Sequence, residues 1–348
     1  QVDVSECSLR AVADATAKPG RLGCFIGELV LVGVVNNTRS LTREVKYAAE
    51  GTEPHTKAQQ DLEILRRRQT EHETLHESRG DVHLLSQIFR NLMAHGRRRG
   101  LRSLSLAVVV YREDAQTRLA PAHGGGWTLI WQAAAETFLT ALAAIAASGI
   151  TVQRLDVYNS VERCSLACNE PSAVNFESQA LATSLASLKT LAMSFSDRII
   201  NPSTEDFGLT GDSADEWEHD WNDESREPED LERELYQDST FRGLPGLIQR
   251  CQRLESLELH YYQLDDLIFS ELNRYRERFL PCITEMTPLP PLKRVVLRGF
   301  RVRPADVLAF LQRLQPTLRE LSLRGLIVPV EATFETIFDY CTSEEAGL

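Results

Sequence analysis

The stretch LKRVVLRGFRVRPADVLAFLQRLQPTLRELSL (292–323) contains one short pattern twice, with a helical pattern between the two copies. Its first residues, LKRVVL (292–297), and its last, LRELSL (318–323), both fit L-x-x-L-x-L if Val295 takes the place of one leucine. Between them, apolar residues recur at the spacing of an amphipathic helix, namely at Val307, Leu308, Phe310, Leu311 and Leu314. The stretch therefore predicts a strand, a helix and a second strand.

Five further copies of the pattern lie upstream. They are IGELVL (26–31), LRSLSL (101–106), VQRLDV (152–157), LKTLAM (188–193) and LESLEL (254–259). In a strand, the fourth and sixth positions of the pattern share one face, and the residues beside them point the other way. A helical pattern precedes each strand, and helices of this kind supply the crossovers that parallel strands require.

A leucine-patterned strand followed by a return helix is the unit of a leucine-rich repeat, which buries its apolar face against its neighbours. We therefore expect an α/β fold, an irregular leucine-rich-repeat solenoid of horseshoe-like shape with a parallel sheet on the concave face and helices outside. A single domain is expected over residues 1–348, with flexible inserts at 50–80 and 203–238. Chance recurrence in a leucine-rich protein is disfavoured by the constant order of helix and strand.

The acidic charge of the chain is concentrated in one insert. The formal net charge is −12, and residues 203–238 hold 15 Asp and Glu against 2 Arg, so the rest of the chain carries a net charge of +1. This density of like charge is typical of disorder. The nearly neutral remainder gives no reason to expect binding to nucleic acid or to an anionic membrane.

The seven cysteines are scattered, and only Cys164 and Cys168 lie close together, without the second pair or nearby histidine of a zinc site. Reduced thiols are typical of the cytosol and nucleus, where we expect the protein to reside. The most apolar run, residues 133–152, contains Glu136 and is not expected to span a membrane. No cofactor motif is present, and no cofactor is expected.

The sequence HETLH (72–76) fits the metalloprotease pattern H-E-x-x-H with His72, Glu73 and His76. In such enzymes the two histidines bind zinc on one helix face and the glutamate activates water. Here the surrounding QTEHETLHESRG is polar on every side and lacks an apolar stripe that would bury the helix. A zinc hydrolase is therefore kept only as a remote alternative.

The residues beside the leucines are expected on the open face of the sheet. Three consecutive strands place His260, Arg298 and Arg324 at one equivalent position, which predicts a cationic row on strands about 4.8 Å apart. The candidate protein-binding residues are Arg154, Tyr158, Glu258, His260, Arg294, Arg298 and Arg324. None suggests catalysis, so we expect a non-enzymatic recognition surface for a protein substrate. A further hypothesis has residues 203–238 fold across the row and compete with an acidic or phosphorylated partner.

The irregular repeat strands, the long inserts and the early segment SLRAVADATAKPGRLGCFIGELVLVG (8–33) resemble the repeat region of F-box proteins, especially the divergent type of filamentous fungi. The resemblance implies the substrate-binding part of an SCF-type ubiquitin ligase adaptor. Residues 1–25 show no F-box, so a Skp-family adaptor and a cullin are expected partners only if an F-box lies upstream of Gln1. The alternative is a leucine-rich-repeat scaffold or inhibitor unrelated to ubiquitin transfer.

Overall fold

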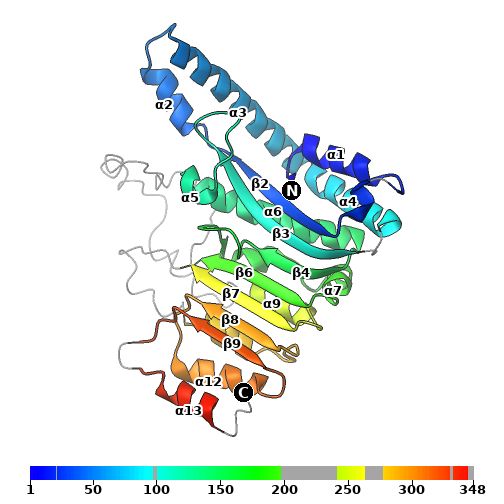
Figure 1. Cartoon of the computed structure of the whole chain (residues 1–348), viewed down its shortest axis with the longest axis vertical. Helices are drawn as coiled ribbons and strands as arrows, with labels where there is room; N and C mark the ends of the chain where they lie inside the picture. Colours follow the sequence, from blue (N-terminus) through cyan, green and yellow to red (C-terminus); the bar gives the residue numbers. More distant parts are fainter. Residues whose placement is uncertain (21, 97–99, 197–240, 263–276, 330–331, 344–348) are drawn as a thin grey trace. The chain divides into compact units, whose positions relative to one another are not determined.

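Every copy of the leucine pattern forms a strand (Figure 1). The computed structural model of the chain describes residues 1–20, 22–96, 100–196, 241–262, 277–329 and 332–343. The patterned strands are β2 (Glu28–Asn36), β3 (Leu101–Tyr111), β4 (Val152–Val157), β6 (Thr190–Ser196), β7 (Ser256–Tyr262), β8 (Arg294–Arg298) and β9 (Glu320–Arg324). Two short strands, β1 (Val2–Asp3) and β5 (Leu166–Ala167), lack the pattern.

The leucine pattern also sets the pairing register of the strands. Its fourth position pairs Leu29 with Leu104, and it forms one continuous row from β4 to β9, made by Leu155, Leu191, Leu257, Val295 and Leu321. These strand pairs are parallel, so the expectation of an α/β chain with a parallel sheet is confirmed. The sequence specifies this register strongly, because a slip of one residue would turn every leucine of a strand away from the core.

The described chain divides into two compact units. Unit 1 comprises residues 1–150 and 160–164, and unit 2 comprises residues 151–159, 165–196 and those described from 241 onwards. Each unit contains part of the leucine pattern and its own buried core. Whether the two units continue one solenoid, as the expected single domain over residues 1–348 requires, stays a prediction.

Unit 1 contains the strand order β1-β2-β3. Its helices are α1 (Glu6–Thr16), α2 (Arg39–Tyr47), α3 (Glu53–Glu77), α4 (Gly80–His95), α5 (Pro121–Gly124) and α6 (Trp127–Ser148), with a 3₁₀ turn at Leu22–Phe25. The α6 helix packs on β2 and β3, and a Cβ atom at Gly33 would lie only 2.4 Å from Thr137 Oγ1. Glycine at position 33 therefore permits the close approach of helix and strand.

The α6 helix is long and apolar enough to cross a membrane by length and composition alone, a criterion that the core helix of a globular unit also meets. In unit 1 it contacts α4, β2 and β3, and Ile130, Phe138 and Ile145 are completely buried. Complete burial of these side chains is typical of a helix in the core of a globular unit.

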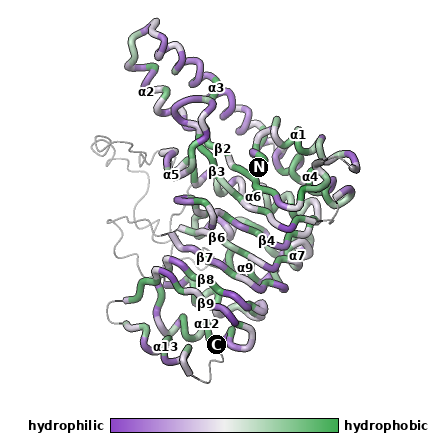
Figure 2. The backbone as a smooth tube through the Cα atoms, viewed as in Figure 1, coloured by the Kyte–Doolittle hydropathy of each residue, from purple (hydrophilic) through white to green (hydrophobic). Residues whose placement is uncertain are grey.

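The insert at residues 50–80 is mainly the helix α3, which begins after Thr52, whose hydroxyl accepts a hydrogen bond from the His55 N–H. Figure 2 shows α3 as mainly hydrophilic, in contrast to the hydrophobic strands β2 and β3. One side of α3 is nevertheless buried, and Leu62 and Leu65 join a cluster with Leu41. The insert, expected to be flexible, is thus largely one helix with a buried side, although its sequence is mostly polar. The second insert, residues 203–238, lies outside the described residues.

Unit 2 contains the strand order β4-β6-β7-β8-β9, with β5 paired to β6. Its helices are α7 (Gln179–Leu185), α9 (Gly243–Arg250), α11 (Phe279–Thr284), α12 (Pro304–Leu314) and α13 (Glu335–Thr342), with a 3₁₀ turn at Glu170–Ala173. The α12 helix confirms the helical pattern that the sequence places between the last two strands. Phe279 lies at the centre of an aromatic cluster, with ring centroids 5.3 Å from Phe241 and Tyr261 and 5.6 Å from Phe195.

Candidate functional site

The polar face of unit 2 consists of the residues that alternate with the buried leucines along β4, β6, β7, β8 and β9. Strand pairing aligns them in three rows, which are Arg154, Thr190, Ser256, Arg294 and Glu320; Asp156, Ala192, Glu258, Val296 and Ser322; and Ser194, His260, Arg298 and Arg324. On β6, Ala192 and Ser194 are buried, whereas the charged residues on β7, β8 and β9 reach solvent. Most of the accessible charged residues of the polar face therefore lie on β7, β8 and β9, and Arg154 on β4 is exposed as well.

Arg294 is held between two carboxylates on the polar face. Its Nε donates to Glu320 Oε1 at 2.9 Å, and its Nη1 donates to Glu258 Oε2 at 3.4 Å. The hydrogen bond to Glu320, with a smaller contribution from Glu258, raises the pKa of Arg294. Asn159 Nδ2 donates to the other oxygen of Glu258 at 2.9 Å. The charge of Arg294 is therefore compensated within the face, and Glu258 is fixed from two sides.

Arg154 lies at the β4 end of the polar face and is exposed. Its Nη2 is 4.0 Å from Asp156 Oδ2, and Asp156 Oδ1 accepts the backbone N–H of Asn159 at 3.0 Å. The Asp156 side chain is almost fully buried. This carboxylate thus fixes the chain where it leaves β4, and it compensates part of the charge of Arg154.

His260 does not contribute a positive charge to its row. Arg298 Nη2 donates to His260 Nδ1 at 2.9 Å, and the Ser194 hydroxyl lies 3.3 Å from the same nitrogen. Burial and, secondarily, the neighbouring Arg298 lower the pKa of His260 to about 4. The expected cationic row is therefore corrected: its three positions are adjacent, but at neutral pH only Arg298 and Arg324 are charged.

Arg298 and Arg324 are directly paired across β8 and β9, and both are exposed. Arg324 Nε donates to Ser322 Oγ at 3.0 Å, and Arg298 donates to His260. Within the part of the chain that the structure describes, neither guanidinium forms an ion pair with a carboxylate. The polar face thus has a compensated end at Arg294 and an uncompensated positive end.

Tyr158 is fully buried, which corrects the expectation that it is presented beside Arg154. The strand β4 ends at Val157, and Tyr158 has a φ of 60° in the left-handed region. A backbone turn of this kind ends the alternation of side chains between the two sheet faces. The aromatic ring therefore belongs to the core and not to the polar face.

Two contributors to the polar face were absent from the candidates drawn from the sequence. Glu320 occupies the position equivalent to Arg294, so aligning the leucine patterns was enough to find it. Asn159 lies beyond the end of β4 and reaches Glu258 from another part of the chain. No local pattern in the sequence marks such a contact.

The motif residues of HETLH lie in unit 1 and have separate partners. His72 Nε2 is 3.2 Å from Glu136 Oε2, and this hydrogen bond raises the pKa of His72 against the opposing effect of burial. His76 Nδ1 is 3.0 Å from the buried Asp81 carboxylate. Glu73 is exposed and accepts a hydrogen bond from Gln69 on the same helix.

Thr140 adds a second hydrogen bond to Asp81 Oδ2, at 2.8 Å. Among the described residues, no group of three or more His, Cys, Asp or Glu side chains is placed to hold a metal ion. Each histidine of the motif links α3 to another helix of unit 1, so the geometry gives no support to the zinc-hydrolase alternative.

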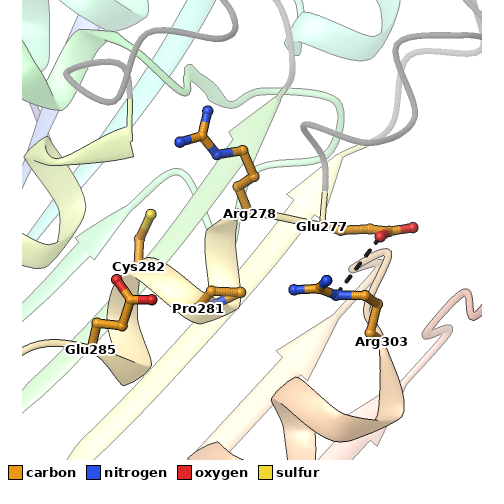
Figure 3. A pocket seen from close by; sticks show the side chains of 6 residues that line it. All are labelled: Glu277, Arg278, Pro281, Cys282, Glu285 and Arg303. Atoms are coloured by element: carbon orange, nitrogen blue, oxygen red, sulfur yellow. Dashed lines mark ion pairs between the residues drawn. The ribbon is translucent and has the colours of Figure 1, made fainter.

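A hollow of about 440 Å³ on unit 2 is lined by Glu277, Arg278, Pro281, Cys282, Glu285 and Arg303 (Figure 3). Arg303 lies 4.0 Å from Glu277 and 2.7 Å from Asp306, and Arg301 also pairs with Glu277 at 3.6 Å. The Arg278 guanidinium lies over the Phe241 ring. These charged groups are engaged with neighbours, so the hollow is a weaker candidate site than the polar face.

No protein-family model matches the chain, and neither a curated protein nor a solved structure matches it. The resemblance to F-box repeat regions therefore rests on the sequence pattern alone.

Proposed function

We propose that the chain is a non-enzymatic protein-recognition module of the leucine-rich-repeat type, and that the polar face of unit 2 binds its protein partner. The regular register of β4, β6, β7, β8 and β9 supports this proposal, since it turns the leucines to one side of the sheet and aligns mostly polar residues on the other. An extended surface built from stacked units is the way in which solenoids bind proteins.

The observation that carries the proposal is the uncompensated positive end of the polar face. Arg298 donates to His260 Nδ1, so the neutral imidazole carries its proton on Nε2. The row of His260, Arg298 and Arg324 therefore offers only N–H donors. Guanidinium groups favour carboxylates because they can form paired, charge-assisted hydrogen bonds with them. The partner that fits this row is an acidic protein segment.

A charge reversal tests the acidic partner directly. The probe is a fluorescein-labelled decapeptide of aspartate and glutamate, and its binding is followed by fluorescence anisotropy at low salt. Arg298→Glu should weaken binding by about tenfold or more, because a like charge replaces a donor at the centre of the row. Arg319→Glu is the matched control, since Arg319 is also exposed but lies just before β9 and outside the three rows.

The control substitution should change the affinity by less than about twofold, which is the effect of net charge alone at an exposed site. Equal losses for Arg298→Glu and Arg319→Glu would show that only the overall charge of the protein matters. Absence of binding by the unsubstituted chain would reject an acidic partner for this face.

The family resemblance extends the proposal to a biological role. The chain would be the substrate-binding part of an SCF-type ubiquitin ligase, linked to a Skp-family adaptor and a cullin through an F-box elsewhere in the protein. A leucine-rich-repeat scaffold or inhibitor would use the same face without these partners. Copurification of a Skp-family adaptor with the full-length protein supports the ligase role, and its absence under conditions where a known F-box protein retains the adaptor supports the scaffold.

A further inference from the structure

The outer edge of β9 differs from the inner strands of unit 2. No described strand pairs with this edge. The leucines of the inner strands are at most 1% exposed, whereas Leu321 and Leu323 on β9 are only partly buried. The two exposed large apolar side chains among the described residues of unit 2, Ile327 and Phe338, both follow β9 in the chain. The apolar core of unit 2 is therefore incompletely covered at this end.

The backbone of β9 leaves the main-chain groups of its two leucines facing this edge. The N–H of Glu320 donates to the Lys293 carbonyl, and the carbonyl of Arg324 accepts from the Gly299 N–H, so both residues turn their backbone toward β8. Backbone direction alternates along a strand, so the N–H and C=O groups of Leu321 and Leu323 point outward. Such an edge can pair with another strand.

The charges of β9 are complementary when two copies of the strand run antiparallel. In an antiparallel pair centred on Ser322, Glu320 of each copy lies opposite Arg324 of the other, and Leu321 lies opposite Leu323. The outward backbone groups of the two leucines make them the hydrogen-bonded pairs, which leaves Glu320 and Arg324 as the closer, non-hydrogen-bonded pair. Charged residues on an edge strand usually prevent pairing, but in this order they attract.

We propose that two copies of the chain associate by antiparallel pairing of their β9 strands. The two-fold axis that relates them passes midway between the two copies of Ser322. An axis perpendicular to the sheet keeps the leucine faces of both copies on the same side, so each copy covers the exposed end of the other's core. The contact is isologous, as closed dimers require. Arg324 gains a carboxylate partner, Glu320 of the second copy, and Glu320 retains its own contact with Arg294. Arg298 lies on β8, outside the paired strands, and stays available to an acidic partner.

Cysteine cross-linking tests the register of this pairing. In a background in which Cys7, Cys282 and Cys341 are replaced by serine, no accessible thiol remains, because the other four cysteines are buried. Ser322→Cys then places two thiols opposite each other at a spacing compatible with a disulfide. Mild oxidation should give a covalent dimer. Ser256→Cys, on the inner strand β7 of the same face, should stay monomeric, and equal cross-linking of the two variants would overturn the proposal.

Charge exchange tests the pairing without a cross-link. In sedimentation-equilibrium experiments, Glu320→Arg and Arg324→Glu should each weaken self-association by about tenfold or more, since each places like charges opposite each other twice. The double variant E320R/R324E restores opposite charges and should recover association to within about threefold. Circular dichroism confirms that each variant is folded. An unsubstituted chain that stays monomeric at every concentration, or a folded double variant no better than the single ones, would contradict the proposal.

Discussion

His72 in unit 1 and His260 in unit 2 occupy opposite electrostatic environments. His72 lies beside the Glu136 carboxylate, which raises its pKa, whereas burial and the Arg298 guanidinium lower the pKa of His260 to about 4. In unit 1, His72 and His76 of α3 have carboxylate partners on the helices α6 and α4. In unit 2 the polar face ends in guanidinium groups that have no carboxylate partner among the described residues. The difference separates a cluster that stabilises the fold from a surface that can bind a partner.

The largest expected effect concerns the buried carboxylate of unit 1. Asp81→Ala should lower the free energy of unfolding by about 2–4 kcal/mol, because it leaves the buried Thr140 hydroxyl and the partly buried Val82 N–H without their acceptor. Glu258→Ala on the half-exposed polar face should cost less than about 1 kcal/mol. Hydrogen exchange read separately in α4 and in β7 measures each effect, and similar losses in the two units would remove the distinction between them.

The two histidines should give pH dependences of opposite sign. The raised pKa of His72 stabilises the folded chain below the unfolded value of about 6.5, and this contribution is lost as the pH rises through the folded pKa. The lowered pKa of His260 has no effect above about 6.5 and destabilises the folded chain as the pH falls from there toward 4.

Urea denaturation of His72→Gln and His260→Gln against the unsubstituted chain measures this difference. Relative to His72→Gln, the unsubstituted chain should become more stable as the pH falls from 8 to 6. Relative to His260→Gln, it should become less stable as the pH falls from 7 to 4.5. If the stability difference changed with pH in the same direction for both variants, one of the two histidines would have been assigned to the wrong environment.

The smallest expected effect is that of Arg298→Ala on stability. The side chain is exposed and makes a single hydrogen bond to His260, so its removal should change the free energy of unfolding by less than about 0.5 kcal/mol. The same substitution should weaken binding of the acidic peptide. A thermal melt and an anisotropy titration of one sample give both values, and a large loss of stability would indicate a structural role for Arg298.

The strands and their register could be predicted from the sequence because the leucine spacing is local and repeats seven times. The adjacency of His260, Arg298 and Arg324 followed from the same alignment. The neutral state of His260 depends on burial and on a contact with Arg298, and L-x-x-L-x-L carries no information about either of these. The buried turn at Tyr158 has no glycine to mark its left-handed backbone.

The buried side of α3 was missed for a different reason. Ala58, Leu62, Leu65 and Leu75 lie on one helix face, but Arg68 and His72 occupy the same face between them. These two polar residues interrupt the apolar period and conceal it. In the folded unit they are satisfied by tertiary contacts, Arg68 with the Ala115 carbonyl and His72 with Glu136.

The central claim, that the polar face of unit 2 binds an acidic partner, is tested most directly by nuclear magnetic resonance of the histidine side chains during titration with the acidic peptide. The imidazole signals of His260 should shift in proportion to peptide bound, and those of His72 should stay unchanged as an internal control in the same molecule. Equal shifts of both histidines, or a shift of His72 alone, would contradict the claim.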